Sequence, residues 1–474
     1  MPSLRFPFLR APSPATCRRL LALLAASPAL VVAQGTPAVS TLAAFSGSQA
    51  SSAPVKGPDG ALYGPTAQTS FVAGGLIYRL AANGSSITTV YQLKPVDGYS
   101  PLGGLLLGSD KLFYGTTAIG SAEQASSTGT IYRVAPDGSG FQVIYRFQSF
   151  TGTNALGQSI NPDGANPDAE LIEGSDGLLY GVTRAGGANG NGVVFKVGRD
   201  GTGFKLLHVF GAITSATDAS PVLNADGINP AAPLLLGADS YLYGTASRGG
   251  TSGSGTIFRV GLDGTGFELL RTLPALVTST TTPPTNADGA GPAAGLTDGR
   301  DGRLYGVTSQ GGSAGIGTVF ALDPVGKVFT VLHNFNGAKG AQPTGELLLA
   351  QDGKLYGTTA AGGTNSAGVT TSLGTIFSIA RDGTGFTSLY SFDGKDGATP
   401  NGSLLQLDAN TFVGLALAGG RCSQGGVYQL SLTGATVKGV TNCGRKNNSG
   451  GGGVAPALLL LLAVAAAARR LRAD

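Results

Sequence analysis

Three Asn-x-Asp-Gly segments carry the side chains best suited to bind a metal ion. Each places an Asn and an Asp two positions apart ahead of a glycine: Asn161/Asp163, Asn224/Asp226 and Asn286/Asp288. Oxygen ligands at this spacing form the opening of a calcium-binding loop. No glutamate follows at the position that completes such a loop, and Asx-Gly turns need no metal. We therefore expect weak calcium loops at most, with plain turns as the alternative.

The two histidines stand in equivalent sequence contexts, His208 in Leu-His-Val-Phe and His333 in Leu-His-Asn-Phe. A histidine at a repeated position favours packing over catalysis. No Ser–His–Asp set, paired-carboxylate motif or phosphate loop stands out. The Gly-x-Gly strings separate strand-like segments and lack the helix of a dinucleotide site. The sequence therefore assigns no catalytic residue, no cofactor and no metal site beyond the weak loops.

These segments belong to a repeat of 50 to 66 residues, marked by an acid or glycine turn followed by Leu-Tyr-Gly. The motif tyrosines, with a valine in a worn seventh copy, are Tyr63, Tyr114, Tyr180, Tyr243, Tyr305, Tyr356 and Val413. We interpret the tyrosines as packing between repeats with a polar tip. An array of this period can form one closed domain in a long chain.

Each repeat predicts four short antiparallel strands. In the fourth copy they are 233–236, 241–245, 255–260 and 267–273. Asp-Gly turns join the first pair and the last pair, because glycine accepts positive φ and aspartate caps the turn. The predicted fold is all-β, a seven-bladed β-propeller over 34–446, helical only in the terminal targeting segments. A linear β-solenoid is the alternative, although it would need shorter coils.

Both ends of the array support a closed ring. Residues 41–47 resemble the last strand of other repeats, such as 389–394. The chain therefore starts on an outer strand, which we expect to complete the seventh blade beside 435–440. Strand parity then places the tight turns on one face and all long connections on the other. The three longest connections, 148–167, 211–230 and 274–292, thus share the face where binding is expected.

The N-terminus is predicted to be a secretory signal peptide, residues 1–33. An arginine-bearing segment precedes an apolar run from Leu20 to Val32, and a small-residue cleavage site lies between Ala33 and Gln34. The run is too short to span a bilayer permanently. We therefore expect an exported protein that signal peptidase processes.

The C-terminus has three parts in order. Asn447–Gly453 is a glycine-rich linker, Val454–Ala468 is apolar, and three arginines follow within the last six residues. This tail resembles the GlyGly-CTERM sorting signal, which implies processing by rhombosortase, a rhomboid-type protease. The predicted processing segment comprises Ser449, Gly450, Gly451, Gly452 and Gly453. A plain tail anchor is the alternative, although 15 apolar residues are short for a stable span of roughly 20.

Export determines how the cysteines are interpreted. After signal removal only Cys422 and Cys443 remain, and an oxidising compartment favours a disulfide between them. A loop of that size would add about 3 kcal/mol of stability. Two unpaired buried thiols, or a reactive pair, are the alternatives. Metal binding is disfavoured, since no nearby His or Cys completes a site.

The net charge of +4 belongs to the ends, and residues 34–453 carry −2. The mature body therefore has no electrostatic basis for binding nucleic acid. The apolar C-terminal segment (454–474) predicts contact with the membrane, at least transiently. We expect a cell-surface, outer-membrane or secreted protein of a Gram-negative bacterium.

The repeat resembles the GloVer family, the Gloeo/Verruco-type repeat of choice-of-anchor surface proteins. The match rests on Leu355–Thr359, the glycine pair at 362–363, Gly374–Phe377, the strand with Tyr390 and Phe392, Asp396-Gly397 and Pro400. The family name implies varied C-terminal anchors and brings no catalytic residues.

We therefore expect a binding module that recognises protein or glycan with its long-loop face. The alternative is an exported hydrolase or lyase that uses the propeller channel, and a third hypothesis is a structural envelope component. Acids and histidine lining the channel on that face would favour the enzyme, and a flat polar or aromatic surface would favour binding.

Overall fold

The computed structural model describes residues 35–441, apart from 46–47, 69–73, 121–127, 215–220, 279–282 and 365–367. The described residues form strands and connections without an α-helix. None of the described elements is a helix that could span a membrane. The predicted signal peptide, processing segment and apolar tail lie outside the described residues. Those three assignments therefore stay predictions.

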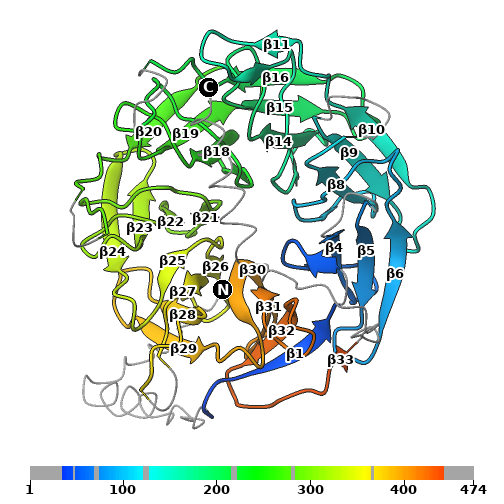
Figure 1. Ribbon diagram of the computed structural model, residues 1–474, viewed down its shortest axis with the longest axis vertical. Helices are drawn as coiled ribbons and strands as arrows, with labels where there is room; N and C mark the ends of the chain where they lie inside the picture. Colours follow the sequence, from blue (N-terminus) through cyan, green and yellow to red (C-terminus); the bar gives the residue numbers. More distant parts are fainter. Residues whose placement is uncertain are drawn as a thin grey trace, which may run out of the picture.

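The strands form a seven-bladed β-propeller, as the repeats predicted (Figure 1). Each blade is built on a four-stranded antiparallel meander that runs from the central axis outward, and blades 1, 6 and 7 contain a short additional strand segment. In the fourth blade the strands are Leu235–Leu236, Tyr241–Ala246, Thr256–Gly261 and Glu268–Thr272, each within the range predicted for it or within one residue of it. The β-solenoid alternative is thereby excluded.

The strands of each blade follow one another along the chain from the inner edge outward. Blades 1 and 2 comprise β2 (Ser48–Ala50), β3 (Val55–Lys56), β4 (Leu62–Gln68), β5 (Leu76–Leu80) and β6 (Ile87–Gln92), then β7 (Leu106–Leu107), β8 (Phe113–Thr117), β9 (Thr130–Val134) and β10 (Gln142–Arg146). Blades 3 and 4 comprise β13 (Ile172–Glu173), β14 (Leu179–Thr183), β15 (Val193–Val197) and β16 (Lys205–Val209), then β17 (Leu235–Leu236), β18 (Tyr241–Ala246), β19 (Thr256–Gly261) and β20 (Glu268–Thr272). Blades 5 and 6 comprise β21 (Thr297–Asp298), β22 (Leu304–Thr308), β23 (Thr318–Asp323) and β24 (Val328–Asn334), then β25 (Ala341–Pro343), β26 (Leu348–Leu349), β27 (Leu355–Ala361), β28 (Thr375–Ile379) and β29 (Thr387–Ser391). Blade 7 differs in taking its outer strands from both chain ends, and comprises β30 (Ala398–Asp408), β31 (Thr411–Ala418), β32 (Gly426–Ser431), β1 (Ala38–Ala44) and β33 (Val440–Thr441). A small hairpin, β11 (Gly152–Thr153) and β12 (Ser159–Ile160), lies in the connection between blades 2 and 3.

The ring is closed by strands from both ends of the chain. β1 pairs antiparallel with β32, in the outer position that the chain's own fourth strand occupies in other blades. β33 then pairs parallel with β1 through Ala43 and Ala44, so the N-terminal strand lies between two C-terminal ones. The expectation that the first strand completes the seventh blade is confirmed. Such closure leaves no open blade at the seam.

A tyrosine–aspartate hydrogen bond fixes the tight turn between the first two strands. Tyr180 donates through its hydroxyl to Asp176 Oδ2 at 2.7 Å, while Asp176 Oδ1 accepts from the backbone N–H of Leu178. Gly177 within this turn has a φ of 75°, which an Asp-Gly pair accommodates without strain. The same bond recurs in six blades, through Tyr63–Asp59, Tyr114–Asp110, Tyr180–Asp176, Tyr243–Asp239, Tyr305–Asp301 and Tyr356–Asp352.

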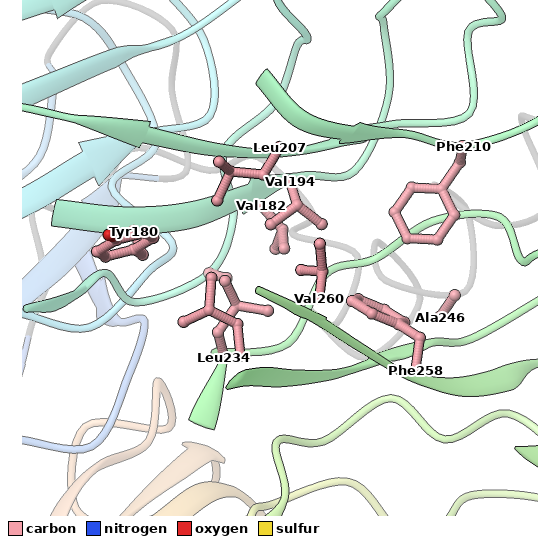
Figure 2. Close-up of a cluster of buried hydrophobic side chains, with 11 residues drawn as sticks. Tyr180, Val182, Val194, Leu207, Phe210, Leu234, Ala246, Phe258 and Val260 are labelled. Carbon is pink, nitrogen blue, oxygen red and sulfur yellow. The ribbon is translucent and has the colours of Figure 1, made fainter. Parts of the chain in front are cut away.

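The hydrophobic core lies between neighbouring blades. Between blades 3 and 4, Val194 and Leu207 of one face Leu234 and Val260 of the other, as Figure 2 shows. Tyr180 in this cluster has no exposed surface, although its hydroxyl reaches the turn aspartate. The tyrosines are therefore packing residues with a hydrogen-bonded tip, as the sequence indicated.

Candidate functional site: the channel mouth

The inner strand of every blade is interrupted where it faces the central axis. In blade 6 the break separates β25 from β26, and in blade 7 it is a register shift within β30 between Asn401 and Leu405. Strand irregularities of this kind re-aim side chains and are frequent beside functional sites. The interruptions line a cavity of about 310 Å³ on the axis, contributed by all seven blades: 51–53, 102–104, 168–170, 231–233, 293–295, 344–346 and 401–403.

Two glutamates face this channel from blades 3 and 6. Glu170 and Glu346 occupy the same position in their repeats. Each lies three residues before the last inner-strand residue that pairs with the second strand, Glu173 in blade 3 and Leu349 in blade 6. Each carboxyl group lies over a glycine of the preceding blade. A Cβ on Gly104 would come within 2.2 Å of Glu170 Oε2, and one on Gly295 within 2.6 Å of Glu346 Oε2. Each glutamate carboxyl group thus occupies a space, or notch, that a side chain on the facing glycine would fill.

The environment of both glutamates favours their neutral form. Burial raises the pKa of Glu170 to about 8, and the negative charge of Glu346 adds to the shift. Burial raises the pKa of Glu346 to about 7. Neither pKa is lowered by a hydrogen-bond donor or a cation, so no described residue neutralises these groups. Perturbed acids in a concave site are typical of functional positions.

A third acid, Asp168, lies in the same interruption as Glu170. Its Oδ2 forms an ion pair with Arg184 Nε at 2.9 Å, and its side chain is 10% exposed. Burial raises its pKa to about 6 against the opposing charge of Arg184. Its Oδ1 is buried without a hydrogen-bond partner among the described residues. An unmet acceptor of this kind requires an explanation, because leaving it unpaired costs free energy.

The three acids lie midway along the channel wall, between the long-connection end and the tight-turn end of the inner strands. In blade 3 the Ala165–Ala185 bridge lies on the long-loop side of them, and the tight turn after Glu173 lies beyond the paired strand end. Around the mouth the side chains are polar, with Arg184, Arg248 and Gln310 exposed. In blades 2 to 7 a proline lies near the start of the inner strand, at the mouth of the channel. The residue before that proline has a positive φ in each case: Ser100, Asn166, Asn229, Gly291, Gln342 and Thr399.

Threonines on the second strands hold the interruptions in place. Thr116 donates from its hydroxyl to Ala169 O of the next blade at 3.3 Å, and Thr245 donates to Ala294 O at 3.0 Å. Thr358 makes the equivalent bond to Gly402 O. The channel lining is therefore fixed by neighbouring blades, as preorganised sites require.

The Asn-x-Asp-Gly segments have their oxygens committed to protein donors. Asn161 Oδ1 accepts from the backbone N–H groups of Gly164 and Gly187, and Asp163 accepts from Gln148 N and Tyr145 Oη. Asn224 and Asn286 repeat the pattern of two glycine donors. Asp226 binds His208 and Gly211, and Asp288 binds Arg271. These segments clamp the long connections to the blade, and the calcium assignment stays a prediction without geometric support.

Both histidines lie on outer strands, away from the channel. His208 stacks on Phe267 with ring centroids 3.5 Å apart, and its Nε2 lies 2.8 Å from Asp226 Oδ2. His333 stacks on Phe386 at 3.6 Å. Tyr91 and Tyr145 hold the same position in other blades and stack likewise, on Phe141 and Phe204. Each ring thus fastens its blade to the next, which agrees with the packing interpretation.

Cys422 lies in the connection between β31 and β32, on the long-loop face of blade 7. Thr441, the last described residue, ends β33 beside Ala44, whose partner across the sheet is Gly426. The chain therefore leaves the described region at the edge of the blade that bears Cys422. Cys443 lies outside the described residues, so its disulfide with Cys422 stays a prediction.

Sequence reasoning missed Asp168, Glu170 and Glu346. Aligning the repeats could have found the two glutamates, because the other five repeats have an uncharged residue at that position: Ala53, Gly104, Pro233, Gly295 or Ser403. Periodicity alone could not say that this position faces the axis, because the interruption breaks strand alternation.

Comparison with known proteins identifies the family. The model of the Gloeobacter/Verrucomicrobia repeat matches residues 51–273 and 230–459, and the chain belongs to this family. No curated protein sequence matches the chain.

Solved structures are similar to this chain only at low identity and with TM-scores below 0.5. Oligogalacturonate lyase from Vibrio parahaemolyticus is 11% identical, with 83% of this chain and 93% of that chain covered and a TM-score of 0.47. A xyloglucanase from Xanthomonas campestris is 12% identical, with 80% and 52% covered and a TM-score of 0.46. The nidogen/laminin complex shows 15% identity, 65% and 87% coverage and a TM-score of 0.37. These values are too low to indicate a function.

Proposed function

We propose that this propeller is a binding module whose ligand face is the long-connection face, centred on the channel mouth. The observation that carries the proposal is the gathering of the longest connections and a polar rim on that one face, around the end of a channel that three acids line. Rigid blades that present variable connections are a common arrangement for recognition. The opposite face consists of tight turns whose aspartates are already bonded within the protein. Those between the first two strands bond the motif tyrosines, and those between the last two strands bond the following Ser or Thr.

The proposal is tested by shortening the loops while keeping the clamps. Replacing residues 149–160 with a Gly-Ser pair removes β11 and β12 and leaves Asn161 and Gln148 in place. We expect loss of signal on an array of glycans and surface proteins probed with the full chain. A replacement in the tight turn 199–203 is the control and should leave binding intact. Full retention of every array signal by the loop variant, with an unchanged melting temperature, would refute the proposal.

A hydrolase or lyase working in the channel is the second candidate, because acids do line the channel. The histidine expected beside them is absent there, since His208 and His333 are both on outer strands. A hydrolase and lyase screen on polysaccharides distinguishes the candidates. Turnover that Glu170→Gln and Glu346→Gln both abolish would establish the enzyme.

We also propose export, with the mature protein on the cell surface, at the outer membrane or secreted from a Gram-negative bacterium. The signal-like segment 1–33 and the three-part tail after 446 support this, with signal peptidase and a rhomboid-type protease as processing partners. Mass spectrometry of the secreted protein should give an N-terminus at Gln34 and a C-terminus within 449–453. A mature chain that retains 454–474 would instead indicate a plain tail anchor.

A further inference from the structure

We infer that blade 7 carries a redox-sensitive strap, in which a disulfide between Cys422 and Cys443 fixes the C-terminal strand β33 across the end of β1. The strap determines how firmly the ring is closed, and so goes beyond the proposed binding function. The inference rests on the placement of β33, the position of Cys422 within its repeat, and the short chain between Thr441 and Cys443.

Blade 7 is the blade whose outer strand most needs a strap. In blades 1 to 6 the fourth strand follows the third through a tight turn, whereas in blade 7 it is β1, which the chain supplies from its other end. A strand without a covalent turn to its neighbour can detach alone. Among the described residues, blade 7 is also the one blade with a strand outside its fourth, because β33 pairs with β1 there.

The chain that leads into β33 already follows the outer edge of β1. The backbone N–H of Val437 donates to Ser40 Oγ at 3.4 Å, and Val437 packs against the same apolar cluster as Leu42. Gly439 lies so close to β1 that a Cβ there would come within 2.1 Å of the carbonyl oxygen of Thr41. The strand β1 is thus enclosed between β32 and β33, which belong to one continuous segment of the chain.

The connection that bears Cys422 matches the one between the second and third strands of blade 3. Each contains a parallel bridge that joins the first glycine of a pair to the residue five places later, 186–191 in blade 3 and 419–424 in blade 7. The two connections can therefore be compared residue by residue. Cys422 stands where blade 3 has Asn189.

Asn189 shows what this position reaches. Its side-chain amide donates to the carbonyl oxygen of Phe210, the residue that follows the fourth strand of blade 3. The residue that follows the fourth strand of blade 7 is Phe45. The equivalence therefore places Cys422 at the end of β1, beside Phe45.

The direction of β33 brings the second cysteine to the same place. Thr441 lies opposite Ala44 in the parallel pair, and Cys443 follows two positions later in the sequence. Two residues of extended chain span about 7 Å, so Cys443 is expected one residue beyond the level of Phe45. A disulfide needs Cα atoms within about 7 Å of each other, which this placement allows. The bond then crosses the end of β1.

Oxidation locks the strap and reduction releases it. A dithiol reductant breaks the S–S bond, each sulfur takes up a proton, and the dithiol is itself oxidised to a disulfide. The bond gives β1 no covalent link of its own, so hydrogen bonds and packing still close the ring. With the strap locked, however, β33 stays in place and β1 is held within one covalent loop, which restricts its outward detachment.

Thiol labelling and hydrogen exchange of the full chain test the inference, with Cys17→Ser present so that two cysteines remain. In denaturant, iodoacetamide should label neither cysteine before treatment with dithiothreitol and both cysteines after it. Reduction of the folded protein should speed exchange in β1 at least about tenfold, because the loop constraint is lost. Exchange in β16, a fourth strand within a continuous chain, should change by less than about twofold.

Cys422→Asn is the sharpest variant, because blade 3 has asparagine at the same position. In the unreduced protein it should speed exchange in β1 as reduction does, and dithiothreitol should then change nothing further. Cys443→Ser should match it, and the double variant should add nothing, since both substitutions remove one bond. Ser423→Gly is the matched control. It introduces the glycine that blade 3 has there and keeps both thiols, so the response to reduction should persist.

Three results would overturn the inference. Labelling of both thiols without reductant would show that no bond forms, and a reducible dimer would show that the cysteines pair between chains. Equal exchange in β1 before and after reduction would show that the strap does not hold the strand. Should a variant fail to fold, reduction of the chain with both cysteines still decides. None of these outcomes affects the loop-replacement experiment, so the proposed binding face is judged separately.

Discussion

At the scale of residues, the pKa of an outer-strand side chain depends on the residue that faces it from the following connection. On the outer strands an aromatic or basic side chain stacks on the next blade and faces an aspartate, as in Tyr145–Asp163 and His208–Asp226. In blade 5 the residue at the aspartate position is Lys339. His333 therefore lacks an acceptor for Nε2, and burial together with Lys339 lowers its pKa to about 4.

This lowered pKa predicts an acid-sensitive site. The folded protein holds His333 neutral while the unfolded chain protonates it near pH 6.5, so stability present above pH 6.5 is lost as the pH falls toward 4. Lys339→Asp should restore the pair seen at His208 and raise the pKa of His333 by about one unit or more. Histidine NMR titration measures this, with His208 as the internal control. An unchanged His333 titration in the variant would contradict the account.

At the scale of elements, the Asn-Asp clamp determines how each long connection leaves its blade. Asn224 is 2% exposed and bonds backbone groups of Gly211, Gly227 and Gly250, which belong to three separate segments. One side chain thus satisfies polar groups that have no regular strand partner.

Removing the clamp should destabilise the protein independently of calcium. Asn224→Ala leaves several buried backbone groups unpaired and is expected to cost about 2–4 kcal/mol of unfolding free energy. Urea denaturation with calcium and with chelator measures it. The same loss in both conditions is expected, whereas a wild-type stability that falls on adding chelator would revive the calcium-loop hypothesis.

At the scale of the whole molecule, the ring is closed non-covalently inside blade 7, where the N-terminal strand β1 pairs with β32 before the chain continues into blade 1. Leu42 of β1 is fully buried against Leu62 and Leu80 of blade 1 and against Val427 of blade 7. Leu207 of β16 holds the equivalent position between blades 3 and 4, inside a continuous chain.

These equivalent leucines allow the seam to be tested. Leu42→Ala and Leu207→Ala should each lower the unfolding free energy by about 2–4 kcal/mol through the cavity left behind. Only Leu42→Ala should speed hydrogen exchange in β1 and blade 1 beyond the global effect, since a terminal strand can detach alone. Equal exchange patterns in the two variants would show that the ring opens nowhere preferentially.

The sequence by itself determined the blade count, the four strands per blade, the tight turns and the closing strand. It did so because Asp-Gly turns and the Leu-Tyr-Gly strand are local signals repeated along the chain. Only the tertiary structure decided the candidate site. Glu170 and Glu346 are 176 positions apart and line one cavity because ring closure brings blades 3 and 6 to one axis. Their notches are glycines of other blades, and such pairings depend on the curvature of the whole ring, which no local pattern encodes.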